Sequence, residues 1–166
     1  MKIFLIGMPG SGKTTLGRQL ADRLSIDFVD LDAEIEKEEG KAISEIFASS
    51  GHDYFRLVES RLLRTWAAST GSFVMSTGGG APCFHDGITL INKYGVSIFL
   101  DCPVQVLFER VRKNRERPLL HTEDEGEILK RLETMRDERL KCYHQAKIVL
   151  TDPSLESLLQ SLRPHT

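Results

Sequence analysis

The stretch GMPGSGKTT at residues 7–15 decides the fold of this chain, because it matches the pattern G-x-x-x-x-G-K-[ST]. An apolar run, KIFLIG at residues 2–7, precedes it, and a helical pattern follows it. In such a loop the glycines let successive backbone N–H groups point at phosphate oxygens, and the following helix turns its positive end toward the anion. An ordinary glycine-rich connection is the alternative, but here the pattern and its required context coincide. We therefore predict a loop that binds a nucleoside triphosphate.

The residue types of this loop predict how it would act on the nucleotide. Lys13 adds a point charge at the β- and γ-phosphates, and the hydroxyl of Thr14 is a ligand for Mg²⁺, which is the expected cofactor. The predicted nucleotide-binding residues of the loop are Gly10, Ser11, Gly12, Lys13, Thr14 and Thr15.

Strand-like and helical patterns alternate along the rest of the chain. Five short apolar runs cover residues 2–7, 27–30, 72–76, 96–100 and 147–151. These runs are continuous, which is typical of strands that are buried on both faces of a parallel sheet. Helical patterns cover residues 14–24, 52–68, 103–111, 126–145 and 154–162. The alternation predicts a three-layer α/β fold, and 166 residues suit a single domain over residues 1–166.

The composition argues against several classes of partner. The formal net charge is −2, so the chain has no broad basic field for nucleic acid. No apolar run approaches the roughly 20 residues of a membrane-spanning helix. The three cysteines, Cys83, Cys102 and Cys142, form no CxxC pair, which indicates reduced thiols. We expect a cytoplasmic protein with neither a nucleic-acid partner nor a membrane partner.

Two aspartates follow the second predicted strand, in the segment FVDLDAE at residues 28–34. Asp30 and Asp32 would share one face if the strand continued through them. They would then lie beside the glycine-rich loop, at the edge where open α/β sheets bind ligands. Asp30 could hold Mg²⁺ through water, and Asp32 could accept a proton from an attacking hydroxyl. A helix N-cap is an equally good interpretation of Asp32.

An arginine and a run of glycines extend the predicted site. Arg56 and Glu59 lie i, i+3 on a helical pattern and can pair. One interpretation is a surface ion pair. The other is that Glu59 orients Arg56 toward an anionic group of a substrate. Three glycines, residues 78–80, directly follow the third predicted strand. They are either a flexible connector or bare backbone that a ligand can approach closely.

Features of other P-loop proteins are missing. A regulatory GTPase reads guanine with N-K-x-D, but the segment INKYG at residues 91–95 lacks the aspartate. A hydrolytic ATPase usually has an aspartate at the end of a Walker B strand, but the segment VMSTGGG at residues 74–80 has none. Asp101 is interpreted first as a structural loop residue and second as a metal ligand. These absences argue against a regulatory GTPase and a hydrolytic ATPase.

Six segments together resemble the shikimate kinases, in the order and approximate spacing of that family, over nearly the whole chain. They are GMPGSGKTT, FVDLDAEIE, YFRLVES, STGGG, RERPLL and RLKCY. The resemblance implies a P-loop kinase fold with a five-stranded parallel sheet, a substrate-binding region at residues 33–60 and a mobile lid at residues 112–125. It implies a monomer that transfers the γ-phosphate of ATP to the 3-hydroxyl of shikimate.

The resemblance also implies a role for each matching residue near the nucleotide. Arg117 in the lid would reach the phosphates and would act in catalysis together with Lys13 and Asp32. Arg110 would stack on the adenine. Asp30 would lie near Mg²⁺, together with Thr14.

On the shikimate side, the resemblance places Asp32 on the hydroxyls of the substrate. Arg56, oriented by Glu59, and Arg139 would both bind the carboxylate. The other substrate contacts that it implies are Phe47, Phe55, Gly78, Gly79 and Gly80.

The chain departs from the family in two places. Lys141 stands where the family often has a proline two residues before Tyr143, and Arg136 could compete with Arg139. The segment CFHDGITL at residues 83–90 lacks an Asn-Arg pair, in a region where no catalytic role is expected. The alternatives are a related kinase such as a gluconate kinase, a nucleoside monophosphate kinase or a non-catalytic nucleotide-binding module.

Overall fold

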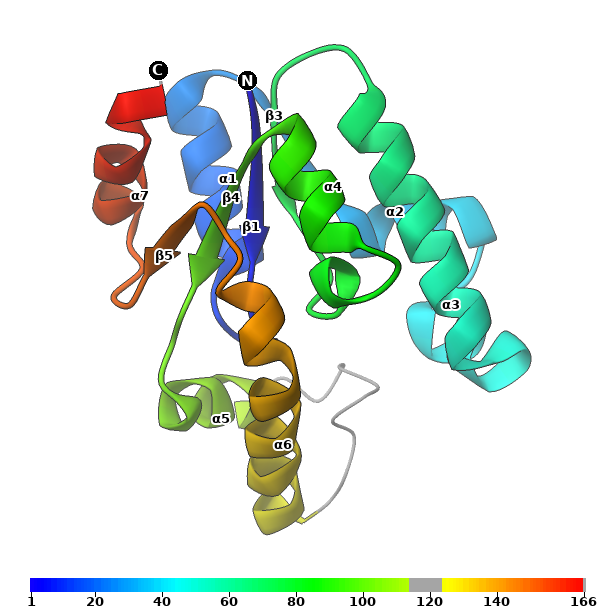
Figure 1. Cartoon of the computed structure of the whole chain (residues 1–166). Helices are drawn as coiled ribbons and strands as arrows, with labels where there is room; N and C mark the ends of the chain where they lie inside the picture. The colour runs from blue at the N-terminus through cyan, green and yellow to red at the C-terminus, as the bar shows by residue number, and fades with distance from the viewer. Residues whose placement is uncertain (114–123, 166) are drawn as a thin grey trace.

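A five-stranded parallel sheet forms the centre of the computed structural model, which describes residues 1–113 and 124–165 (Figure 1). The strands are β1 (Lys2–Ile6), β2 (Asp27–Asp30), β3 (Phe73–Ser76), β4 (Val96–Leu100) and β5 (Ile148–Leu150). Their spatial order is β2-β3-β1-β4-β5, so β1 occupies the middle of the sheet. In the register of these pairs, Leu5 of β1 lies opposite Ser76 of β3 and Ile98 of β4.

The connections between the strands are helical. The helices of the described residues are α1 (Lys13–Leu24), α2 (Leu31–Glu39), α3 (Ile43–Ala68), α4 (Gly87–Tyr94), α5 (Val104–Lys113), α6 (Glu125–Tyr143) and α7 (Leu155–Leu162). Two short 3-10 helices, η1 (Ala81–Cys83) and η3 (Arg163–His165), complete the set. None of the helices in this described part has the length and apolar character needed to cross a membrane.

Side chains of β1 alternate between two hydrophobic cores, one on each face of the sheet. Ile3 and Leu5 belong to the core that α1 and α7 complete, whereas Phe4 and Ile6 belong to the core that α3, α4 and α6 complete. All four side chains are fully buried. Figure 1 shows α1 and α7 on one side of the sheet and α3 and α4 on the other. The predicted three-layer α/β fold is confirmed.

The structure differs from the sequence-based prediction at several elements. The edge strands β2 and β5 are not buried on both faces, because Asp27 is exposed and Val149 is 39% exposed. The helix predicted from residue 52 begins earlier, at Ile43, and contains a non-helical Gly51 with φ 84°. No helix was predicted for α4, which covers most of the segment that was compared with a guanine-reading motif.

The carboxyl ends of β1, β2 and β3 meet at one edge of the sheet. Thr77 continues the pairing of β3 with β1, since its backbone N–H and its hydroxyl both donate to the Leu5 carbonyl, at 3.2 and 3.0 Å. The next residues, the glycine run 78–80, therefore leave the sheet beside the loop that follows β1. The predicted lid falls mainly on residues 114–123, which lie outside the described residues together with Arg117.

Candidate active site

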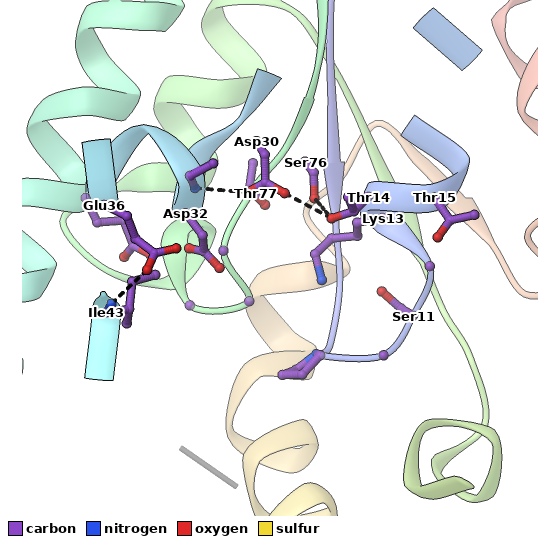
Figure 2. Close-up of a pocket in the computed structure, with 18 of the residues that line it drawn as sticks. Ser11, Lys13, Thr14, Thr15, Asp30, Asp32, Glu36, Ile43, Ser76 and Thr77 are labelled. Atoms are coloured by element: carbon purple, nitrogen blue, oxygen red, sulfur yellow. Dashed lines mark hydrogen bonds between the residues drawn. The ribbon is translucent and has the colours of Figure 1, made fainter. Parts of the chain in front are cut away.

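The glycine-rich loop joins β1 to α1 and has the backbone of a phosphate-binding loop. Gly10 and Gly12 have φ values of 84° and 93°, in the left-handed region that other residues adopt only at a cost. Lys13, 8% exposed, donates from Nζ to the carbonyls of Gly7 and Met8, both at 2.9 Å. Its ammonium group is therefore held against the inner side of the loop (Figure 2). From α5, Arg110 donates to the Gly10 carbonyl at 2.9 Å.

Three oxygen-bearing side chains meet beside the start of α1. The Thr14 hydroxyl lies 3.2 Å from Asp30 Oδ2 and 3.2 Å from the Ser76 hydroxyl, as the dashed lines in Figure 2 show. Sequence reasoning missed Ser76, which nothing in its local pattern distinguishes from a buried strand residue. Oxygen donors of this kind suit Mg²⁺, which keeps several waters and takes few ligands from a protein. Within the described residues, no group of three or more His, Cys, Asp and Glu side chains could hold a metal.

The structure corrects the helix-cap interpretation of Asp32. The strand ends at Asp30, and the helix α2 begins at Leu31, so the two aspartates do not continue one strand. Asp30 is the N-cap, because its Oδ1 accepts from the backbone N–H of Ala33 at 3.3 Å. Asp32 lies in the first turn of α2 and points toward the glycine run. Since Asp30 caps the helix, capping does not explain an aspartate at position 32.

Each glycine of the run 78–80 leaves space for a different charged side chain. A Cβ on Gly78 would lie 2.9 Å from Asp32 Oδ1 and 2.8 Å from Glu59 Oε2. A Cβ on Gly79 would lie 2.9 Å from Arg139 Nη1, and one on Gly80 would lie 2.5 Å from both terminal nitrogens of Arg56. The flexible-connector interpretation is therefore wrong, because side chains of the site pack directly on this backbone.

Arg56 and Glu59 form a buried ion pair rather than a surface pair. Their exposed fractions are 3% and 1%, and Arg56 Nη1 lies 2.7 Å from Glu59 Oε1. The guanidinium also lies over the ring of Phe84, 4.2 Å from its centroid. Glu59 Oε2 has no hydrogen-bond partner within the described part of the chain. Burial raises the pKa of Glu59 to about 7, against the lowering effect of Arg56.

A contact from α6 fixes the middle of the glycine run. Tyr143, which is fully buried, donates from its hydroxyl to the Gly79 carbonyl at 2.6 Å. Arg139 lies one helical turn earlier and approaches Gly79 as well. Arg136, the competing arginine, instead pairs with Asp101 at 2.9 Å. That pair supports the structural interpretation of Asp101 and removes Arg136 from the site.

One cavity of about 830 Å³ brings these groups together. Apart from Arg117, every site residue predicted from the sequence lines it. The aromatic residues Phe47 and Phe55 lie side by side at the α3 end, with ring centroids 4.7 Å apart. Cations line both halves of the cavity, with Lys13 and Arg110 at the glycine-rich loop and Arg56 and Arg139 at the glycine run. The cavity is suited to bind two anionic groups next to each other.

The buried carboxyl of Glu59 makes the stability of the protein depend on pH. Its pKa rises from 4.5 to about 7 on folding, so its contribution is complete below about pH 4.5 and is lost as the pH rises through about 7. The substitution Glu59→Gln keeps an acceptor for Arg56 and removes the titration. The stability of this variant relative to the unsubstituted protein should therefore increase between these pH values, by on the order of 3 kcal/mol at most.

Urea unfolding of both proteins across this pH range measures that difference. Histidines and other groups titrate equally in both proteins and cancel. A difference that does not vary with pH would show that Arg56 outweighs burial and that Glu59 stays ionised throughout.

Comparisons with known proteins identify one family. The family model described as "Shikimate kinase" matches residues 9–163. A shikimate kinase of Novosphingobium aromaticivorans is 45% identical over 152 residues, which cover 90% of this chain and 77% of that protein. One of Bacteroides fragilis is 39% identical over 164 residues, which cover 96% of this chain and 89% of that protein.

Solved structures give the same result. The shikimate kinase from Acinetobacter baumannii in complex with shikimate superposes with a TM-score of 0.90 at 30% identity, over 99% of this chain and 94% of that one. The shikimate kinase from Bacteroides thetaiotaomicron also has a TM-score of 0.90, at 35% identity, over 99% of this chain and 97% of that one. The predictions of family, fold and kinase class are confirmed. The chain belongs to the shikimate kinase family.

Proposed function

We propose that the cavity transfers the γ-phosphate of ATP to the 3-hydroxyl of shikimate, giving shikimate 3-phosphate and ADP. The observation that carries this proposal is the arrangement of Arg56, Arg139 and Asp32 around the glycine run, in the same cavity as the phosphate-binding loop. Two arginines suit a carboxylate, and a carboxylate oxygen of the protein suits a hydroxyl. Shikimate carries both groups on one ring.

The nucleotide lies along the glycine-rich loop in this proposal. Backbone N–H groups and Lys13 hold the phosphates, and Gly10, Gly12 and Thr15 line this part of the cavity. The Ser11 hydroxyl supports an anion here, because it is 1% exposed and has no hydrogen-bond partner within the described residues. Arg110 lies beside the loop, where it can stack on adenine. Arg117 keeps its predicted role at the phosphates, although it lies outside the described residues.

Mg²⁺ fits beside Thr14 and Asp30. Each residue offers an oxygen at the edge of the phosphate loop, and the ion would neutralise charge on the β- and γ-phosphates when bound. Oδ2 of Asp30 is available to interact with the ion while Oδ1 still caps α2.

Shikimate lies at the opposite half of the cavity in this proposal. Arg56 and Arg139 bind its carboxylate, and Asp32 orients the 3-hydroxyl and accepts its proton. Phe47 and Phe55 pack against the ring, and the backbone of Gly78, Gly79 and Gly80 forms the floor. Residues 33–60 thus act as the substrate-binding region. A monomeric state and a cytoplasmic location stay predictions.

A direct comparison of acceptors tests the proposed reaction. ADP release from ATP is measured with shikimate, quinate and gluconate side by side. We expect shikimate to be preferred over gluconate, because its hydroxyls are held on a ring that can pack against Phe47 and Phe55, whereas gluconate is an open chain. Faster turnover with gluconate would overturn the substrate assignment and would leave a related kinase.

Asp32→Asn should nearly abolish phosphoryl transfer while the fold persists. The loss of a general base typically costs about 10²–10⁴-fold in rate. Asparagine keeps the size of the side chain, and the helix cap on Asp30 remains in place. Turnover and thermal melting are measured on the same sample. Turnover within a few-fold of the unsubstituted enzyme would remove Asp32 from catalysis.

Arg139→Ala and Arg136→Ala separate a substrate contact from a structural pair. Loss of a charge-assisted contact to the carboxylate should raise the KM for shikimate by about 10- to 150-fold, with little change in the KM for ATP. Among the described residues Arg136 pairs only with Asp101, so Arg136→Ala is the matched control on the same helix. A larger effect on the shikimate KM from Arg136→Ala would reverse the assignment.

A further inference from the structure

A second cavity, of about 690 Å³, adjoins Arg56 and Arg139 and lies between α3, the η1 segment and α6. It shares both arginines with the first cavity, and His52 and Phe84 line it as well. These two residues contact Arg56, and neither of them lines the first cavity. None of the roles inferred from the family resemblance falls on either of them.

His52 accepts a hydrogen bond from Arg56. The Nε–H of Arg56 lies one helical turn after His52 and donates to His52 Nε2 at 3.3 Å. A ring nitrogen accepts only while it carries no proton, so the proton of a neutral imidazole is then on Nδ1. Asp53 Oδ1 lies 3.8 Å from Nδ1, which is beyond hydrogen-bonding distance.

The position of His52 is itself determined by its surroundings. Gly51, with φ 84°, breaks α3 immediately before it, so His52 begins the second part of this helix. Its ring packs between Phe47 and Phe84, with centroid distances of 5.9 and 5.5 Å. The imidazole is thus a fixed acceptor, although its side chain is 47% exposed.

These contacts define the orientation of the Arg56 guanidinium. The ring of Phe84 packs against the guanidinium, and hydrogen bonds at Nε and Nη1 hold two of its nitrogens. The two bonds use two of the five N–H donors of an arginine. The remaining donors are on the terminal nitrogens, which lie against Gly80. A carboxylate needs two parallel donors in a fixed geometry.

We propose that His52 is a positioning residue for substrate binding, which holds Nε of Arg56 so that its terminal nitrogens meet the carboxylate of shikimate. This inference rests on the proposed function, in which Arg56 binds that carboxylate. Glu59 alone holds one terminal nitrogen of Arg56 and would leave Nε without a hydrogen bond, so the guanidinium would have more freedom to tilt. His52 removes this freedom before the substrate arrives, and it makes no contact with the nucleotide half of the cavity.

The variants His52→Ala and His52→Gln test the inference through steady-state kinetics. Loss of one hydrogen bond to a charged donor should raise the KM for shikimate about 3- to 10-fold in His52→Ala. The KM for ATP should stay unchanged, and kcat should change less than the KM for shikimate. His52→Gln offers an amide oxygen to Nε of Arg56 and should restore most of the lost affinity. Ser50→Ala is the matched control, since Ser50 is exposed on the same segment and bonds only to Ser49 among the described residues.

Several outcomes would overturn the inference. An unchanged shikimate KM in His52→Ala would do so, and so would an equal loss in His52→Gln or an equal rise in the KM for ATP. Thermal melting of each variant shows whether a loss of folded enzyme causes the change, which would also count against a positioning role. If the unsubstituted enzyme itself releases no ADP in response to shikimate, the proposed function fails instead, and the two failures are distinguishable.

Discussion

The parallel pairing of β1 with β3 is the constraint on which the site depends. It aligns Leu5 with Ser76, and Thr77 then binds the Leu5 carbonyl twice, so the phosphate loop and the glycine run leave the sheet side by side. The pairing of β2 with β3 places Asp30 opposite Ser76 in the same row. The oxygen cluster with Thr14 is a direct result of these two registers. Helices α1 and α2 begin at this edge, and their positive N-terminal ends face the cavity.

Charge burial explains how a chain with a net charge of −2 can bind two anions. Lys13 and Arg56 are both nearly inaccessible to water. In such a buried environment each charge interacts more strongly than it would at the surface. Glu59 partly compensates Arg56, at the cost of a raised pKa. A buried ion pair adds little to stability in general, because desolvation offsets the attraction. The pair with Glu59 instead orients the guanidinium of Arg56. The N–H groups of its terminal nitrogens that do not bind Glu59 remain available for a carboxylate.

The sequence predicted the fold and most of the site because each depends on local patterns. The loop at residues 7–15 and the continuous apolar runs were sufficient for the parallel sheet, and the family resemblance supplied the residues that line the cavity. Contacts between distant segments could not be predicted in this way. Nothing near Ser76 or Phe84 in the sequence indicates that they meet Thr14 or Arg56, since those contacts arise from strand register and helix packing. His52 and Arg56, in contrast, lie i, i+4 on a predicted helix, so their contact is local. The sequence left Asp32 open between a helix cap and a catalytic residue, because it did not show that Asp30, the last residue of β2, is the N-cap of α2.

The glycine run shows that a site can depend on residues with no side-chain chemistry of their own. Asp32 and Glu59 pack against Gly78, Arg139 packs against Gly79, and Arg56 packs against Gly80. A mutational library intended to change acceptor preference should therefore keep all three glycines and vary the aromatic residues Phe47 and Phe55. In a ranking of positions by functional groups, the run would score lowest, yet a Cβ atom at any of its three positions would lie less than 3.0 Å from a charged side chain.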